Sequence, residues 1–252
     1  MNRFFVNKDN IFEQQDRIVI NNSEDIKHIT KVLRLNIGDK IEVCNMESMD
    51  YIASICNVDK KFIECKICDK YLSMTESPLE VVLFQGIPKS SKMDLIIQKN
   101  IEIGVAKIVP IISERCVVKI RDKSSEKKKI ERWQKIAGEA AKQCKRGIIP
   151  EIGNMLYIKD INSILEDFDM IIIPYEEEKN RGIRKAIMGK DDIRKIGIII
   201  GPEGGFTKEE VLEVEKLGGL SVSLGPRILR TETAGLVATS ILVYELGDLG
   251  GK

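Results

Sequence analysis

The pattern of apolar and polar residues divides the chain into two parts. In the first 72 residues the apolar positions form short extended runs, at 3–6, 17–20, 40–44, 51–58 and 61–68. Turn signals such as Gly38-Asp39 separate the runs, and one short helix is expected over 23–33. Many short strands with turns between them are typical of a small β-barrel or sandwich. We therefore predict an N-terminal β domain over 1–72.

A break in the pattern follows at 71–78, where serine, threonine and proline gather in the segment YLSMTESP. Beyond it, helical patterns alternate with short β-branched runs that are apolar on both faces. Such runs are typical of buried parallel strands. The expected strands are 79–84, 107–111, 170–173, 197–200 and 220–224. Residues 73–252 are therefore predicted to form an α/β domain with a parallel sheet.

Three helices of the second part carry end signals. A serine at 90–91 is expected to cap the first, and Gly104 lies where a left-handed C-terminal cap belongs. A serine at 124–125 is expected to cap the second, longer helix. Thr207 and Glu210 have the spacing of a capping box, which predicts that the third helix begins there.

The helix expected at 232–246 is apolar around nearly its whole circumference, through Ala234, Leu236, Val237, Ala238, Ile241, Leu242, Val243 and Leu246. A helix that is apolar all round must be buried on all sides. A terminal helix that packs on an open α/β layer has one face that its own domain does not cover. A subunit interface would bury that face. We therefore expect a homodimer through this helix.

Charge and hydropathy then restrict the class of protein. The 252 residues include 40 Lys and Arg against 39 Asp and Glu, which argues against a wholesale polycation. A hydrophobic content of 43% is ordinary for a soluble globular protein. The longest apolar stretch, near 196–200, is far shorter than the roughly 20 residues that span a bilayer, and residues 1–10 lack a signal-peptide core. We expect a cytoplasmic protein without a membrane partner.

The overall neutrality hides a local basic face on the predicted helix 126–146. Lysines and arginines there outnumber three glutamates, and Lys89, Lys92, Lys119, Arg121 and Lys123 lie nearby in sequence. One interpretation is a footprint for a phosphate backbone, and the other is a solvated helix surface. The acidic run 176–178 is expected to be a solvated loop.

Cysteine and histidine counts disfavour most metal and hydrolytic chemistry. Six cysteines without a secretory signal are expected to be free thiols. Cys65 and Cys68 have metal-like spacing, but no second pair of this kind exists and His28 is the sole histidine. A structural zinc site needs four convergent ligands, so we expect no metal. A Ser-His-Asp hydrolase would depend on His28 alone.

Two glycine-rich loops follow predicted strands, with the sequences IGPEGGF at 200–206 and LGPRILRTETA at 224–234. Ligands of open parallel sheets bind at the carboxyl ends of strands, where glycine lets the backbone approach closely. The strand end at 173–175 is a third candidate. Neither loop carries a common phosphate-binding fingerprint. Both therefore favour a nucleoside-like ligand held by main chain and apolar side chains, with simple tight turns as the alternative.

These loops resemble the signature of the SPOUT methyltransferases, and more narrowly that of the family that methylates N3 of a uridine in 16S ribosomal RNA. The resemblance extends over essentially the whole chain. Further matching positions are His28, Val32, Leu33, Arg34, Gly38, Asp39, Gln85, Gly86, Lys89, Lys92, Gln98, Lys99, Glu102, Ile103, Gly104, Val105, Pro110, Ser113, Glu114, Arg115, Glu139, Ala140, Ala141, Gln143 and Arg146.

The resemblance implies a PUA-like RNA-binding β-barrel over 1–72. It implies a SPOUT α/β domain over 73–252, with a trefoil knot, a cofactor site and a dimer interface. Sequence physics alone would not predict a knot, because threaded chains are rare. The implied activity is methyl transfer from S-adenosylmethionine to N3 of a uridine in small-subunit ribosomal RNA, either as free RNA or in the assembled subunit.

The resemblance also implies which residues form the S-adenosylmethionine site. The matching positions are Ile173, Pro174, Ile200, Gly201, Pro202, Gly204, Gly205, Leu224, Gly225, Ile228, Leu229 and Thr231. Methyl transfer to N3 requires loss of the N3 proton, and a positive group near O2 or O4 of the uridine would favour the anion. Arg230 is the first choice for that catalytic group and Arg227 the second. Glu203 either accepts the proton, orients the base or caps the following helix.

RNA backbone contacts are expected from six basic residues, for which plain solvated surface is the alternative: Arg3, Arg34, Lys89, Lys92, Arg115 and Arg146. Two other functions stay open on sequence alone. One is another SPOUT activity, such as ribose 2′-O-methylation. The other is a non-catalytic RNA-binding assembly factor.

Overall fold

The computed structural model describes residues 1–118, 122–190 and 192–251. Lys119 and Arg121, which the sequence adds to the basic face, lie outside the described residues. By its internal contacts the chain divides into two compact units. The first is Met1–Glu76 with Ala141–Ile149, and the second is Ser77–Ala140 with Pro150–Lys252. No signal in the sequence assigns residues 141–149 to the first unit.

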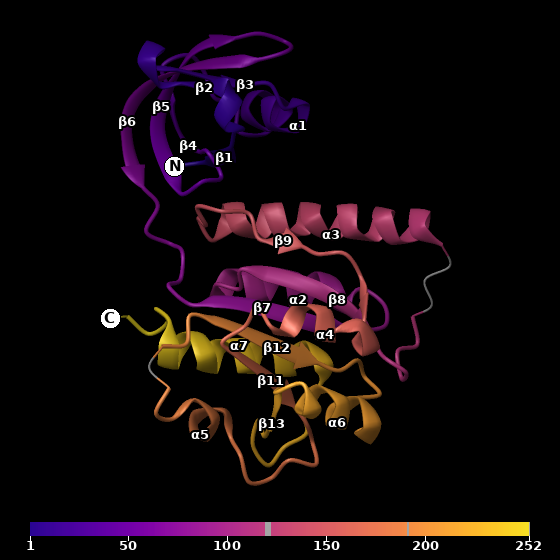
Figure 1. Ribbon diagram of the computed structural model, residues 1–252. Helices are drawn as coiled ribbons and strands as arrows, with labels where there is room; N and C mark the ends of the chain where they lie inside the picture. The colour runs from indigo at the N-terminus through magenta and orange to yellow at the C-terminus, as the bar shows by residue number, and fades with distance from the viewer. Residues whose placement is uncertain (119–121, 191, 252) are drawn as a thin grey trace. The chain divides into compact units, whose positions relative to one another are not determined.

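The first unit is built on a mixed sheet (Figure 1), in which the described residues form six strands. In spatial order these are β1 (Arg3–Phe5), β4 (Lys40–Cys44), β5 (Met49–Val58), β6 (Ile63–Leu72), β3 (Arg17–Ile20) and β2 (Ile11–Phe12). β1 pairs with β4 in parallel, and the other neighbours pair antiparallel. The five predicted runs are confirmed as strands. β2 was not predicted, and β6 continues to Leu72, into the predicted break.

The expected helix at 23–33 is present as α1 (Ser23–Lys27), followed by a π-helical turn, η3 (His28–Val32). Asn22 caps α1, because its side-chain oxygen accepts hydrogen bonds from the backbone of Glu24 and Asp25. The core of the unit lies between this helix and the sheet. Its fully buried side chains include Phe4, Ile18, Ile20, Ile29, Ile41, Val43, Ala53, Ile55 and Ile63.

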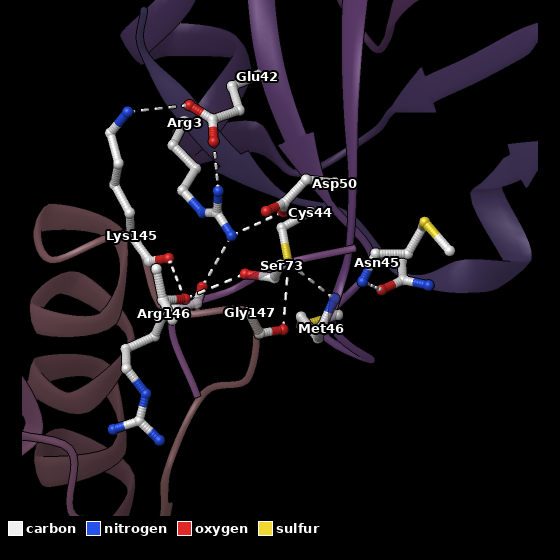
Figure 2. A network of polar contacts seen from close by, with 12 residues as sticks. Arg3, Glu42, Cys44, Asn45, Met46, Asp50, Ser73, Lys145, Arg146 and Gly147 are labelled. Atoms are coloured by element: carbon white, nitrogen blue, oxygen red, sulfur yellow. Dashed lines mark hydrogen bonds and ion pairs between the residues drawn. The ribbon is translucent and has the colours of Figure 1, made fainter. Parts of the chain in front are cut away.

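A buried ion-pair network joins β1, β4 and β5 to residues 145–147 (Figure 2). The Arg3 guanidinium donates to the carboxylates of Glu42 and Asp50, the latter at 2.7 Å, and to the carbonyl of Arg146 at 2.9 Å. The side chains of these three charged partners are only 3–6% exposed. Lys145 approaches Glu42 from the other side at 3.5 Å. One guanidinium therefore neutralises two carboxylates that water does not reach.

The same network fixes the segment after α3 to the first unit. The Cys44 thiol donates to the Gly147 carbonyl at 3.2 Å, and burial raises the pKa of this thiol to about 12. The Arg146 side chain points away from the network in Figure 2 and pairs with Glu76 at 2.6 Å. Residues 145–147 are thus held by both backbone and side-chain contacts.

The second unit contains a parallel sheet in which the described residues form seven strands (Figure 1). The order is β10 (Leu156–Tyr157), β8 (Lys107–Ile112), β7 (Glu80–Gly86), β12 (Lys195–Ile200), β11 (Met170–Pro174) and β13 (Leu220–Val222), with β9 (Glu151–Ile152) also paired to β8. Every pairing is parallel. The predicted α/β fold class with a parallel sheet is confirmed.

The helices of this unit are α2 (Lys92–Ile103), α3 (Lys123–Gln143), α4 (Asn162–Leu165), α5 (Ile183–Ile187), α6 (Lys208–Lys216) and α7 (Thr231–Leu246). Two predicted end signals are confirmed. Gly104 ends α2 with φ +113°, and Thr207 with Glu210 forms the capping box of α6.

The serine caps are corrected. Ser91 occupies the N-cap position of α2, but its side chain makes no capping hydrogen bond. α3 begins at Lys123, so the serines at 124–125 lie inside the helix. Asp122 provides the cap, accepting from the Ser125 backbone at 2.8 Å. Aspartate caps as well as serine does, and here it lies before the first turn.

α7 packs on α2, β7 and β12. A buried polar pair fixes this packing: the Thr239 hydroxyl donates to the Asn100 side-chain oxygen at 2.9 Å, and both residues are fully buried. Asn100 in turn donates to the carbonyl of Ile96. Because each polar group has a partner, the pair specifies how α7 lies on α2. The start of α7 is thereby placed at the carboxyl ends of β7 and β12.

Replacing Arg3 with alanine should destabilise the first unit by about 3 kcal/mol, because Asp50 would lose its paired cation while buried and Glu42 would keep only the more distant Lys145. Urea unfolding of the full chain, followed by circular dichroism, measures this loss. The control is Lys8→Ala, which breaks the exposed pair with Glu47 and should cost less than about 1 kcal/mol. Equal losses in the two variants would contradict the role assigned to Arg3.

Candidate functional site

A cleft lies where β11, β12 and β13 end in the second unit. It comprises two adjoining cavities of about 390 and 130 Å³. Their shared walls are formed by Pro174, Glu176, Ile228, Leu229 and Ala234. The carboxyl edge of a parallel sheet is where such folds bind ligands.

The structure brings the predicted cofactor residues together around this cleft, with one exception. Those that line it are Pro174, Ile200, Gly201, Pro202, Gly204, Gly205, Leu224, Gly225, Ile228, Leu229 and Thr231. The exception is Ile173, which lies fully buried within β11 and lines neither cavity. The three catalytic candidates, Arg227, Arg230 and Glu203, also line the cleft.

The loop after β12 is held against the end of β7. A Cβ atom at Gly86 would lie 2.5 Å from the backbone nitrogen of Pro202, so no larger residue fits without moving the loop. The Thr231 hydroxyl donates to the Gly201 carbonyl at 2.6 Å and accepts from the Gln85 side chain at 2.9 Å. The strand β7, the 201–205 loop and the first turn of α7 therefore form one junction.

Arg115, predicted to contact RNA, is exposed and also shapes the glycine loop. Its guanidinium donates to the carbonyls of Gly204 and Phe206, each at 3.1 Å. A Cβ atom at Gly204 would lie 3.0 Å from the Arg115 side chain. These contacts fix the backbone of the glycine loop, which lines the cleft.

Lys92 lies between two carboxylates at the edge of the cleft. Its ammonium nitrogen is 3.2 Å from Glu203 and 3.1 Å from Glu232. Burial alone would raise the pKa of Glu203. However, hydrogen bonds from its own backbone, from the Lys89 N–H and from Lys92 outweigh it, and the pKa lies below its ordinary value. The Lys92 ammonium is thus paired with carboxylates of the protein itself. Because its pKa is lowered, Glu203 is a weak proton acceptor at neutral pH.

The two arginines of the cleft contrast with Lys92. Arg227 and Arg230 are exposed, and within the described part of the chain no hydrogen bond or ion pair to either guanidinium is found. Arg230 is the N-cap residue of α7, and its side chain makes no capping bond. Both cations are therefore available to a ligand.

The 224–230 loop also offers main-chain donors. No hydrogen bond from the backbone N–H of Arg227, Ile228 or Leu229 is found among the residues described. The Ile228 side chain is 88% exposed and borders both cavities. Unpaired amides beside exposed apolar side chains fit a planar nucleoside-like ligand, as the sequence predicts.

Two of the predicted RNA contacts are corrected. Arg3 and Arg146 are 8% and 5% exposed, and both guanidinium groups are paired with carboxylates inside the first unit. Buried cations of this kind cannot contact a phosphate without breaking their pairs. Arg34 and Lys89 are exposed, so both remain predicted contacts to the RNA backbone. The basic face of α3 is also reduced, because Arg132 pairs with Asp94 through two bonds of 2.7 Å.

Sequence reasoning missed three cleft features. Gln85 is fully buried and supports Thr231, and Glu232 shares Lys92 with Glu203. Glu176 is exposed, as expected for a solvated loop, but it also borders both cavities. The position of Glu176, three residues after the end of the predicted strand 170–173, was the signal that the sequence offered for it.

Within the described residues, no group of three or more His, Cys, Asp or Glu side chains is arranged to hold a metal ion. None of the described helices is both long and apolar enough to cross a membrane.

Comparison with known proteins gives the class. Residues 75–243 match the RNA methyltransferase domain family, and residues 20–68 match the RNA methyltransferase PUA domain family. The fold and the cleft described above therefore belong to an RNA methyltransferase.

Similar proteins narrow the class. Ribosomal RNA small subunit methyltransferase E of Bacillus subtilis is 36% identical over 90% of each chain. A methyltransferase of Legionella pneumophila, solved with its cofactor SAM, is 34% identical, with a TM-score of 0.87 over 98% of each chain. Ribosomal RNA small subunit methyltransferase E of Neisseria gonorrhoeae, solved with S-adenosyl methionine, is 28% identical, with a TM-score of 0.86 over 99% of each chain. The chain belongs to the family of ribosomal RNA small subunit methyltransferase E, which confirms the family predicted from the sequence.

Proposed function

We propose that the protein transfers a methyl group from S-adenosylmethionine to N3 of a uridine in 16S ribosomal RNA of the small subunit. The observation that carries this proposal is the convergence of both glycine-rich loops and two unpaired arginines on one cleft. The relatives named as small-subunit methyltransferases, and the two structures solved with the cofactor, support it.

The residues present fit the cofactor. The unpaired amides at 227–229 suit the edge of an adenine ring, and Ile228 and Leu229 offer apolar contact to its face. Glycines at 201, 204 and 205 let the loop pack closely on itself, on Arg115 and on Glu176, which gives the loop its shape at the cleft. When bound, S-adenosylmethionine supplies an electrophilic methyl group attached to a sulfonium sulfur.

Arg230 stabilises the uridine after loss of its N3 proton, because a guanidinium near O2 or O4 lowers the energy of the anion. Arg227 has the same freedom at the neighbouring part of the cleft. Glu203, with its lowered pKa and its contacts to Lys89 and Lys92, positions the loop and is not assigned as the base. The residues that line the cleft align the cofactor with the uridine. Such alignment supplies much of the rate acceleration of a displacement reaction.

We assign the part of residues 73–252 that forms the second unit to a SPOUT domain with a trefoil knot. β13 lies at one end of the sheet, yet the chain that follows it returns to Gln85 and Gly201 near the middle through the two bonds of Thr231. A chain that is threaded through a loop must return from the end of the sheet to its middle in this way, and this return supports the proposed knot. Residues 1–72 form the PUA-like barrel domain, and the protein acts in the cytoplasm, where ribosomal RNA is modified.

RNA binding by the first unit is assigned to a basic cavity instead of Arg3 and Arg146. The cavity, of about 550 Å³, lies beside α1, and it is lined by Ser23, Ile26, Lys27, Thr30, Lys31, Val58, Asp59 and Lys60. Its three lysines are exposed, and none forms an ion pair within the described part of the chain. Two hydroxyls and three ammonium groups around an apolar floor suit a phosphate next to a base.

The homodimer is assigned to α7. One face of this helix, with Ala238, Leu242 and Val243, is buried in its own unit. On the opposite side Val237 and Ile241 remain half-buried, and Tyr244 is 64% exposed. An apolar helix face left partly open to water favours a second copy of the same helix.

Deletion of the gene should remove N3-methyluridine from small-subunit RNA, and complementation with Arg230→Ala should fail to restore it. Loss of one charge-stabilising group costs about 100-fold in rate. Mass-spectrometric nucleoside mapping measures the modification. Arg194→Ala, an exposed arginine outside the cleft, should restore it fully. Persistence of the modification in the deletion strain would refute the proposed function.

Lys27→Gln with Lys31→Gln should weaken binding to a small-subunit RNA fragment about tenfold at low salt and flatten its salt dependence. Fluorescence anisotropy at several salt concentrations measures both effects. The matched control, Lys40→Gln with Lys66→Gln, removes two exposed lysines of the same unit outside the cavity. Equal weakening by both double variants would mean that the cavity has no special role.

Light scattering at micromolar protein concentration should give twice the mass of one chain. Val237→Glu should reduce it to one chain, because a carboxylate would be buried against the partner's apolar helix. A single-chain mass for the unaltered protein would exclude the dimer.

A further inference from the structure

Glu176 is an exposed carboxylate of the cleft. It follows the end of β11 by two residues and borders both cavities. One of its oxygens lies 3.3 Å from the place that a Cβ atom of Gly205 would occupy, so the glycine leaves room for this carboxylate beside the 201–205 loop. Among the described residues, neither an ion pair nor a hydrogen bond to the carboxylate is found.

The other charged groups of the cleft differ from Glu176 in their pairing. Glu203 is held by Lys92 and by the Lys89 backbone, and Lys92 is in turn shared with Glu232. Arg227 and Arg230 are unpaired but positive. Glu176 is exposed, and it attracts a positively charged part of a ligand, which the arginines repel. A bound ligand displaces water from between the charges, and this strengthens their interaction. Among the described residues that line the two cavities, Glu176 is therefore a carboxylate left without an ion pair and able to attract a cationic group.

We propose that Glu176 selects S-adenosylmethionine over its demethylated product through the positive charge of the sulfonium. This inference rests on the proposed function. In the transfer, the sulfur–methyl bond breaks and its electron pair stays on sulfur, while the lone pair of the deprotonated N3 forms the new bond to carbon. The sulfonium becomes a neutral thioether, S-adenosylhomocysteine. Glu176 then loses its attraction to the sulfur, and the product leaves more readily than the substrate.

Titration calorimetry on the full chain tests this proposal with three ligands. These are S-adenosylmethionine, S-adenosylhomocysteine and sinefungin, in which a carbon bearing an amine replaces the sulfonium. Glu176→Gln should weaken S-adenosylmethionine and sinefungin about tenfold and S-adenosylhomocysteine less than about twofold. The variant keeps the size of the side chain and removes only its charge.

The matched control is Glu177→Gln, which makes the same charge change at the next residue, outside both cavities. It should leave all three affinities unchanged, and thermal unfolding should be the same for both variants. Equal weakening of all three ligands by Glu176→Gln would overturn the proposal, because the carboxylate would then contact a part they share. No weakening, or the same weakening by Glu177→Gln, would overturn it as well. Failure of the unaltered protein to bind S-adenosylmethionine would instead overturn the proposed function itself.

Discussion

The close approach of β7 to the loop after β12 is the constraint on which the cleft depends. Gly86 leaves no room for a side chain against Pro202, and Thr231 ties Gln85 to the Gly201 carbonyl. These contacts fix three segments that are far apart in sequence: a strand end, a glycine loop and the start of a helix. The buried Asn100–Thr239 pair then fixes the rest of α7 on α2. As a result, Arg230, directly before Thr231, has a defined place at the cleft although no hydrogen bond or ion pair to its guanidinium is found among the described residues.

The distribution of ion pairs separates structural from available charges. Arg3, Arg146 and Lys92 are basic residues that the protein itself neutralises, whereas Arg227 and Arg230 have no ion pair within residues 1–118, 122–190 and 192–251. A buried guanidinium is costly to uncover because its carboxylate partners would lose their nearest positive charge. An exposed, unpaired one already lies where a ligand can reach it. Pairing therefore predicts function here better than the type of residue does.

The same distinction explains what the sequence could and could not predict. The glycine loops at 201–205 and 224–230 were recognisable because their signals are local: each directly follows an apolar strand. The strands and the ends at Gly104 and Thr207 were predicted for the same reason. The partners of Arg3 lie 39, 47 and 143 residues away, so no local pattern could show that this arginine is buried. Glu176 was assigned to solvent because a run of three glutamates normally is solvated, and only the neighbouring loops place it at the cleft.

A carboxylate that binds a sulfonium has a cost in catalysis as well as a benefit. It stabilises the cofactor before the reaction more than after it, so part of the binding energy is not available to lower the barrier. The benefit is that the product is bound less tightly than the substrate, which matters where product release limits turnover. Arg230 acts in the opposite sense, because the charge it stabilises develops on the base. Glu176 and Arg230, both without an ion pair within the described chain, thus have different roles in one cleft. Glu176 acts in exchange of the cofactor, and Arg230 acts in activation of the RNA base.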